Sequence, residues 1–263
     1  MLYTNVVDNI LSSNIILNHK YINKELYTMA SDNSNNIKYK MNEHGYRSSS
    51  PINYSEYNVL TLGCSWTMGI GVENEFIWPT LVHNKINKGA LFNYGMYGVS
   101  TSFISKTLFK FVSSQFIPNL VLIMWPGFSR RDYLTDTGQY RKIGGFRKAH
   151  KKDPVWKNNE EDLLFLQLQN DNQDLMKFWE AYNFVEIISR LYGIKIFHTV
   201  TGYYYDVFSE LKTNLDYTIN YDRFFDPVDC YKNDKQAQDN EHPGQNWHQT
   251  FAEHFYKFIE DKI

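Results

Sequence analysis

Short apolar runs that alternate with helix-like stretches constrain the fold of this chain more than any other feature. The first three runs are Asn58 to Leu62, Leu91 to Tyr94 and Leu120 to Trp125. Continuous apolar runs of this length are typical of strands buried on both faces of a parallel sheet. The stretches between them, residues 78–86 and 102–113, carry apolar residues at helical spacing. The alternation predicts βα units on a parallel sheet.

The same pattern returns in the last third of the chain. Residues 175–191 have a strong helical pattern, Gly193 ends it, and residues 194–200 read as a strand. Residues 247–259 form a closing amphipathic helix. We therefore predict a three-layer α/β/α, flavodoxin-like sandwich with a mostly parallel sheet of about five strands.

The polar segments outside this pattern divide the chain. Residues 1–57 are irregular and read as an N-terminal arm, whereas residues 58–263 form one α/β domain. Residues 127–174 are too long and too polar for a simple connection, so we interpret them as an insertion that covers a site. A chain of 263 residues is expected to form one large domain.

Charge and composition exclude several classes of function. The formal net charge is −2, and the one basic cluster, residues 148–152, is too short to neutralise a nucleic acid. No window approaches the roughly 18 apolar residues of a membrane span. Two cysteines provide no disulfide framework. The N-terminus has no signal-peptide pattern, so we expect a cytoplasmic or virion-associated location and leave the oligomeric state open.

Ser65 lies where a parallel sheet binds its ligands, just beyond the first predicted strand. Backbone N–H groups of the following turn could stabilise an oxyanion formed after its hydroxyl attacks a carbonyl carbon. Serine needs a histidine as base and a carboxylate that orients the histidine. Asp239 and His242, three residues apart before the last helix, supply both groups. The residues thus predict a catalytic triad.

Other interpretations of these residues are possible. Ser65 could be a helix N-cap or a turn residue, and the Cys64 thiol could be the nucleophile, although a small packing residue is the simpler interpretation. Asp239, His242 and His248 could hold a metal ion, but a fourth ligand at a recognisable spacing is lacking. The glycines after Ser65 are not followed by Gly-Lys-Ser/Thr. We therefore predict no metal and no cofactor.

Three sequence blocks resemble those of the SGNH, or GDSL-like, hydrolase family. Residues 63–72 match its first block with cysteine in place of aspartate, and residues 239–243 match its final Asp-x-x-His-Pro. Residues 93–100 are similar to its second block, an asparagine followed by a glycine. The resemblance implies that Ser65 is the nucleophile and that the N–H groups of Ser65 and Gly98 form the oxyanion hole. Asn93 is then a candidate contact for the substrate or the oxyanion.

The third block departs from the family. Relatives carry an asparagine that donates to the oxyanion, but residues 122–131 contain none. Arg130 or Arg131 could contact the substrate or the oxyanion instead. The segment Asn42 to Ser48 resembles an Asn-x-x-Gly-aromatic-Arg lead-in of some relatives, and His248 lies where relatives often carry a further histidine.

These observations lead to a functional expectation. We expect a serine esterase that acts on short acyl esters, such as carbohydrate O-acetyl groups, through Ser65, His242 and Asp239. The high aromatic content, 17%, favours a small-molecule or carbohydrate ester over a long-chain lipid. The alternative is a catalytically inactive protein of the SGNH fold that binds glycans or has a structural role, because the third block has changed.

Overall fold

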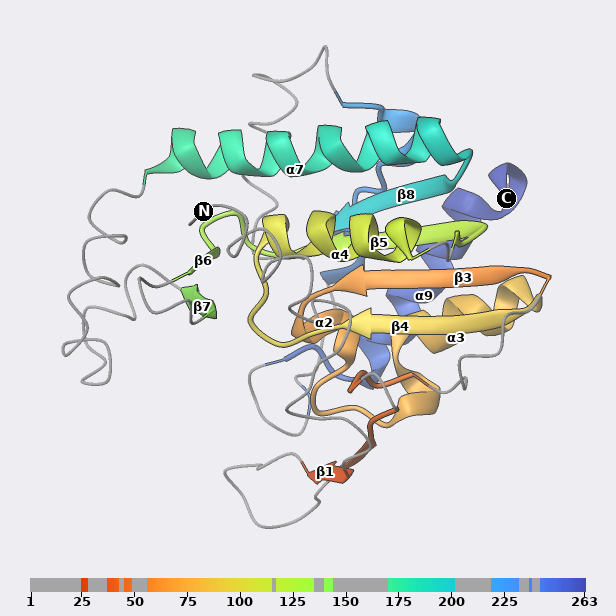
Figure 1. Cartoon of the computed structure of the whole chain (residues 1–263). Helices are drawn as coiled ribbons and strands as arrows, with labels where there is room; N and C mark the ends of the chain where they lie inside the picture. The colour runs from red at the N-terminus through yellow and green to blue at the C-terminus, as the bar shows by residue number, and fades with distance from the viewer. Residues whose placement is uncertain are drawn as a thin grey trace, which may run out of the picture.

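The computed structural model describes residues 25–27, 37–42, 45–48, 56–114, 117–134, 140–143, 170–201, 219–231, 237 and 242–263. Its centre is a parallel sheet in the order β4-β3-β5-β8 (Figure 1). The strands are β3 (Asn58–Gly63), β4 (Ala90–Gly95), β5 (Leu120–Trp125) and β8 (Lys195–Val200). Apart from partly buried or exposed first residues on β4 and β8, the strand residues are buried. The predicted α/β sandwich is confirmed.

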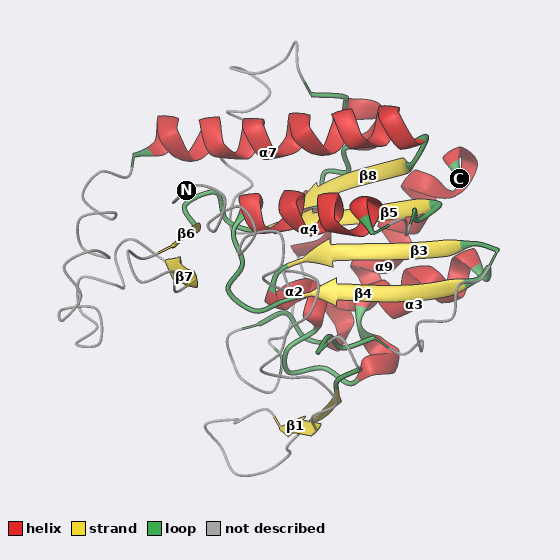
Figure 2. Ribbon diagram, viewed as in Figure 1, coloured by secondary structure: helices red, strands yellow, loops and turns green. Residues whose placement is uncertain are grey.

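Four long helices cover the sheet, and their bounds are α3 (Trp78–Ile86), α4 (Thr101–Ser113), α7 (Asp171–Tyr192) and α9 (Gln245–Ile259). Helix α4 packs against α7, and α3 packs against α9. The two pairs lie on opposite faces of the sheet (Figures 1 and 2). The helices and the sheet thus form three layers. No helix in the described ranges combines the length and the apolar character needed to cross a membrane.

Local signals explain where these helices begin and end. Pro79 lies in the first turn of α3, where a missing N–H is harmless. The side chain of Asn170 accepts a hydrogen bond from the backbone N–H of Gln173, so α7 begins four residues earlier than its apolar pattern predicts. Gly193 ends α7 with a φ of 67°, a conformation that favours glycine.

The sheet has four strands in the described part of the chain, where about five were predicted. Beyond β8, a single parallel bridge pairs His198 with Phe224. Phe224 also closes the short helix η4 (Tyr221–Arg223) by a hydrogen bond from its N–H to the carbonyl of Tyr221. The chain therefore touches the edge of β8 at one residue without continuing as a strand.

Smaller elements surround the sheet. Two antiparallel pairs are present, β1 with β2 and β6 with β7. The elements are β1 (Glu25–Tyr27), β2 (Lys38–Lys40), α2 (Ser65–Met68), η1 (Asn74–Phe76), β6 (Arg131–Leu134), β7 (Tyr140–Ile143), η5 (Val228–Tyr231) and η6 (Glu260–Lys262). Among them, the one-turn helix α2 matters most for function, because it follows the central strand β3 directly.

Candidate active site

Ser65 is the first residue of α2, at the carboxyl end of β3. The N-cap position belongs to Cys64, so the alternative interpretation of Ser65 as an N-cap is wrong. Ser65 is 2% exposed, and no described residue makes a hydrogen bond with its hydroxyl. Cys64 is fully buried in the main core, as expected for a packing residue. The hydroxyl is thus held at the ligand-binding edge of the sheet without a structural partner there.

Two glycines allow α2 to lie directly on the ends of the strands. A Cβ on Gly63 would lie 2.0 Å from Thr67 Oγ1 and 2.9 Å from the carbonyl oxygen of Met124. A Cβ on Gly95 would lie 2.3 Å from the backbone nitrogen of Met68. Any larger residue would push α2 away from the sheet. These glycines therefore fix the position of the Ser65 turn.

Asn93 fastens the same turn from β4. Its Oδ1 accepts hydrogen bonds from Thr61 Oγ1 at 3.1 Å and from the N–H of Gly95 at 3.0 Å. Its Nδ2 donates to the carbonyl of Thr67 at 3.1 Å. Asn93 is 1% exposed. In this structure its amide holds α2 in place, whereas the sequence pointed to a contact with the substrate or the oxyanion.

Arg47 binds backbone carbonyls at the C-terminal end of α2. Its Nη1 donates to the carbonyls of Met68 and Gly69 at 3.2 and 2.6 Å, and its Nη2 donates to the carbonyl of Val72 at 2.7 Å. The guanidinium also lies over the ring of Tyr39, 4.3 Å from its centroid. Burial lowers the pKa of Arg47 to about 10, so the group keeps its charge at neutral pH. A buried cation thus stabilises the carbonyl end of α2.

The role of Arg47 was not predicted from the sequence, although its segment was noted as a family-like lead-in. The preceding Tyr46 stacks on Tyr94 with ring centroids 4.0 Å apart. Burial raises the pKa of Tyr46 far above its ordinary value. An arginine beside an aromatic residue in a polar segment was the available signal, but the carbonyls that it contacts lie more than 20 positions further along the chain.

The loop that carries Gly98 begins beside the Ser65 turn. The N–H of Met96 donates to the carbonyl of Gly63 at 3.0 Å, which joins this loop to the end of β3. Gly98 has a φ of 71°, which favours glycine, and open space surrounds the position of a Cβ. The neighbouring side chain of Tyr97 is 65% exposed. The two predicted oxyanion donors are therefore Ser65 at the start of α2 and Gly98 in the loop after β4, and a hydrogen bond joins the beginnings of these two segments.

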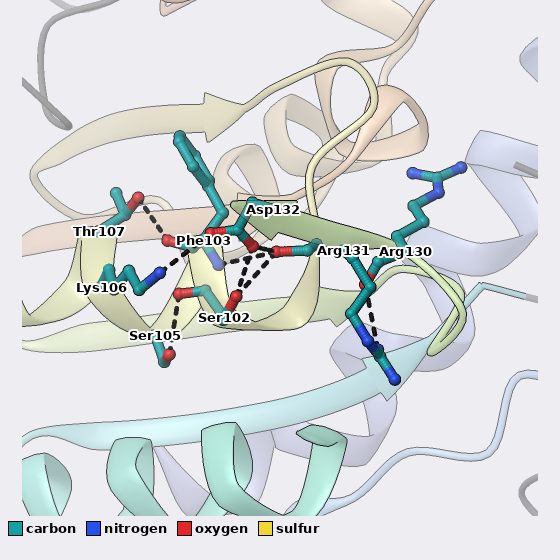
Figure 3. A network of polar contacts seen from close by, with 9 residues as sticks. Ser102, Phe103, Ser105, Lys106, Thr107, Arg130, Arg131 and Asp132 are labelled. Carbon is teal, nitrogen blue, oxygen red and sulfur yellow. Dashed lines mark hydrogen bonds and ion pairs between the residues drawn. The ribbon is translucent and has the colours of Figure 1, made fainter. Parts of the chain in front are cut away.

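Asp132 ties the segment after β5 to the start of α4 (Figure 3). Its carboxylate accepts hydrogen bonds from the hydroxyls of Ser100 and Ser102 and forms an ion pair with Lys106 at 2.9 Å. Ser100 also caps α4 by accepting from the N–H of Phe103. Burial alone would raise the pKa of Asp132, but Lys106 and the two hydroxyls hold it below its ordinary value. Asp132 thus anchors the residue that ends the Gly98 loop.

Arg130 and Arg131 point in different directions from this segment (Figure 3). Arg131 donates to the carbonyl of Phe128 at 2.7 Å and forms an ion pair with Asp174 on α7. Its guanidinium is therefore engaged with α7. Within the described part of the chain, the buried Nη1 of Arg130 has no hydrogen-bond partner. Of the two candidates, Arg130 is the one with a donor left to bind a ligand.

His242 lies just before α9, and the first turn of α9 packs on α2. The indole rings of Trp66 and Trp247 meet edge to face with centroids 5.0 Å apart. The carbonyl of His242 accepts from the N–H of Ala237 at 2.7 Å. Asp239 lies outside the described residues. No hydrogen bond joins the side chains of Ser65 and His242. In enzymes without ligand, catalytic hydrogen bonds are often longer than in the complex.

His248 is a structural link between α9 and α3. Its Nδ1 accepts a hydrogen bond from the N–H of Trp78, the first residue of α3, at 3.1 Å. Burial, together with the smaller effects of the charges of Arg47 and His242, lowers the pKa of His248 to about 3. The ring is therefore neutral at physiological pH and caps α3. Among the described residues, no group of three His, Cys, Asp or Glu side chains could hold a metal ion.

A second buried histidine, His198, was not singled out in the sequence analysis. His198 on β8 accepts at Nδ1 from the indole N–H of Trp125 at 3.2 Å, and its Nε2 lies 3.0 Å from Glu186 Oε1. Because an indole nitrogen only donates, the proton of the neutral ring is on Nε2 and points to Glu186. Burial lowers the pKa of His198, against the effect of Glu186. The pair of His198 and Glu186 joins α7 to β8, and the hydrogen bond from Trp125 joins β8 to the end of β5.

The fold of this chain is similar to those of several solved proteins. No family model and no curated protein matches the chain. A putative lipolytic protein of the G-D-S-L family from Desulfitobacterium hafniense is 12% identical, with a TM-score of 0.47, over 77% of this chain and 99% of that chain. A G-D-S-L family lipolytic protein from Veillonella parvula is 13% identical, with a TM-score of 0.46, over 79% and 98%. A carbohydrate esterase is 11% identical, with a TM-score of 0.46, over 92% and 84%.

Proposed function

We propose that this protein is a serine esterase that hydrolyses short acyl esters, with carbohydrate O-acetyl groups as the favoured substrates. Ser65 is the nucleophile, His242 the general base and acid, and Asp239 the carboxylate that orients His242. The observation that carries the proposal is the packing of α2 against the start of α9, through Trp66 and Trp247, 5.0 Å apart. This contact joins the element that begins with Ser65 to the one that follows His242.

Apart from the ester and water, the proposed reaction uses only groups of the protein. The hydroxyl proton of Ser65 moves to His242 while its oxygen forms a bond to the acyl carbon. The bond to the alcohol oxygen then breaks, and His242 returns the proton to the leaving alcohol. Water attacks the acyl-enzyme in the same way and releases the carboxylic acid and the serine hydroxyl. No metal or cofactor takes part.

Backbone and arginine donors would stabilise the negative oxygen of both tetrahedral intermediates. The N–H of Ser65 begins α2, and that of Gly98 lies in the loop after β4, which the hydrogen bond from Met96 to Gly63 at 3.0 Å joins to the end of β3. Among the residues that the structure describes, Nη1 of Arg130, in the segment that follows β5, has no hydrogen-bond partner. A charged donor there would replace the asparagine that the third block lacks.

The carbohydrate substrate is favoured by the exposed ring beside Gly98. Tyr97 is 65% exposed and comes directly before the glycine. Aromatic rings with one face in solvent provide apolar platforms against which sugars pack. Replacing Tyr97 by alanine should raise the KM for an O-acetylated sugar and leave the turnover of p-nitrophenyl acetate unchanged.

Labelling with a fluorophosphonate probe, together with turnover of p-nitrophenyl acetate, tests the chemistry. The wild type should be labelled, and Ser65→Ala should abolish labelling and lower turnover by about 10³-fold or more. His242→Ala should have a similar effect. Ser113→Ala, an exposed serine at the end of α4, is the matched control and should behave as the wild type. A wild type that neither labels nor hydrolyses any short acyl ester would contradict the proposal.

The second candidate is a glycan-binding protein that retains the fold without turnover. Two observations favour it: the side chains of Ser65 and His242 are not joined by a hydrogen bond, and residues 122–131 lack the asparagine of the family's third block. Calorimetric titration with O-acetylated oligosaccharides separates the two candidates. Binding without release of acetate would support this second function.

A further inference from the structure

The turn of residues 127–131 follows β5 at the edge of the sheet where Ser65 lies. In the parallel register of β3 and β5, Gly63 pairs with Met124. The chain after Met124 therefore leaves the sheet beside the chain after Gly63, which soon reaches Ser65 at the start of α2. Arg130 belongs to this turn, and its Nη1 is buried without a hydrogen-bond partner within the described ranges. The backbone that carries Arg130 thus has to place this donor.

Arg131 fixes the backbone of the turn. Its Nη1 donates to the carbonyl of Phe128 at 2.7 Å and to the carbonyl of Arg130 at 3.3 Å. The N–H of Arg130 donates to the carbonyl of Gly127 at 3.1 Å. The N–H and the carbonyl of Arg130 are therefore both bonded inside the turn. A fixed backbone restricts the rotamers of the side chain, and Arg130 leaves the turn in a direction different from that of Arg131 (Figure 3).

Asp174, in the first turn of α7, holds the guanidinium of Arg131 in place. The carboxylate of Asp174 forms an ion pair with Arg131 Nη2, and the two side chains are 8% and 14% exposed. The planar guanidinium can bind a carboxylate through one nitrogen and backbone carbonyls through the other, which a lysine cannot do. Removing one partner of such a pair leaves an uncompensated charge. Asp174 thus keeps Arg131 bound to the turn.

A stacked pair of rings attaches the same turn to α7 a second time. Phe128 lies on Phe178, with ring centroids 4.2 Å apart, and both side chains are buried in the main core. The turn is therefore held from α7 on both sides of Arg130, by Phe128 before it and by Arg131 after it.

We propose that Arg131 and Asp174 are positioning residues that hold Arg130 where it donates to the oxyanion of the ester. The inference rests on the proposed esterase function and on Arg130 as the replacement for the asparagine of the third block. Arg131 and Asp174 act through the backbone of the turn and do not touch the substrate. Their effect on turnover should be large for residues outside the site, because small displacements of a charged donor weaken its stabilisation of the transition state steeply.

A double-mutant cycle that includes Arg130 tests this role with p-nitrophenyl acetate as substrate. Arg130→Met should lower kcat by about 100-fold, as expected for the loss of one oxyanion donor. Asp174→Asn should lower kcat by about tenfold and leave KM within about twofold, because the lost interaction is made only in the transition state. In the Arg130→Met background, Asp174→Asn should change kcat by less than about twofold, because the donor that it positions is gone.

Urea unfolding separates positioning from stability. Asp174→Asn should lower the stability by the same amount with and without Arg130→Met, whereas its effect on kcat should depend on Arg130. Glu180→Gln is the matched control, because it removes a carboxylate from the exposed ion pair with Lys177 on the same helix. This control should leave kcat unchanged in both backgrounds. Arg131→Lys keeps the charge but lacks the planar guanidinium, so it should repeat the loss of kcat even if Asp174→Asn does not fold.

The outcomes distinguish this inference from the proposed function. A wild type that hydrolyses esters, with equal losses of kcat for Asp174→Asn in the two backgrounds, would overturn the inference alone. A folded Arg131→Lys or an Arg130→Met with the kcat of the wild type would do the same. A wild type without turnover would overturn both the inference and the esterase proposal.

Discussion

Replacing Gly95 by alanine tests whether the packing of α2 on the sheet positions Ser65. The new Cβ would lie 2.3 Å from the backbone nitrogen of Met68 and 2.5 Å from the carbonyl carbon of Thr67. Ordinary contacts of a Cβ begin near 3.4 Å, so the shortfall is about 1.1 Å (3.4 minus 2.3). Backbone atoms cannot rotate away as a flexible side chain can. Helix α2 must therefore move, and Ser65 moves with it.

Two measurable effects follow from this displacement. Forcing an extra carbon into a packed interior costs about 1–3 kcal/mol, which lowers the Tm by several degrees in a protein of this size. A misplacement of about 1 Å in a catalytic group lowers turnover about 100-fold. We expect Gly95→Ala to react about 100-fold more slowly with a fluorophosphonate probe while it still unfolds cooperatively. The labelling rate is measured from reactions that are quenched at set times, and the loss of stability is measured separately by thermal unfolding.

Gly193→Ala is the matched control for the loss of stability. Gly193 has a φ of 67°, but open space surrounds the position of its Cβ. Alanine there costs about 1–2 kcal/mol of backbone strain at the end of α7. The control should lower the Tm and keep the labelling rate of the wild type. If Gly95→Ala also keeps that rate, close packing at residue 95 does not position Ser65, and the reasoning fails.

Three further substitutions test the buried polar groups. Arg47→Met leaves three carbonyls in and after α2 without their donor and, at about 1–3 kcal/mol for each unsatisfied buried acceptor, should cost at least about 3 kcal/mol in urea unfolding; a loss below about 1 kcal/mol would contradict this. Asp132→Asn should destabilise the protein at neutral pH. Because its folded pKa is lowered, the advantage of the wild type over this variant should shrink as the pH falls below about 4, measured by unfolding at several pH values. His248 has a lowered pKa of about 3 in the folded protein. Between about pH 6.5 and 3, His248 is therefore protonated in the unfolded chain and neutral in the folded one, and the free energy of unfolding decreases by up to about 1.4 kcal/mol for each unit by which the pH falls. His248→Asn should reduce that slope, and an unchanged slope would exclude His248 as its cause.

The strands and helices of the central fold could be predicted because their signals are local. The run from Leu120 to Trp125 coincides with β5, and the helix predicted over residues 78–86 coincides with α3. A buried parallel strand is apolar at every position, so its length can be read directly. The early start of α7 was missed, because the cap at Asn170 lies in a segment with no apolar periodicity.

The contacts around the candidate site could not be predicted in the same way. The sequence marks Ser65 and Gly98, but the partners of Asn93 and Asp132 depend on which loops meet after folding. An asparagine at the end of a strand has the same local signal whether it binds a ligand or a backbone carbonyl. The separation of Arg130 from Arg131 likewise follows from the position of α7, which supplies the partner of only one of them.

The number of groups that hold α2 bears on what Ser65 does. Arg47 from the arm and Asn93 from β4 donate to backbone carbonyls in and after this one-turn helix, Gly95 lets it touch the sheet, and Trp247 packs on its side. Burying an arginine is costly, and three hydrogen bonds from Nη1 and Nη2 of Arg47 to carbonyls at this helix offset part of that cost. A serine that only begins a one-turn helix does not require such support, and the Ser65 hydroxyl caps no N–H of the described chain. A fixed turn that holds an uncommitted hydroxyl at the carboxyl edge of a parallel sheet is what nucleophilic catalysis needs, because small displacements of the reacting oxygen lower the rate steeply.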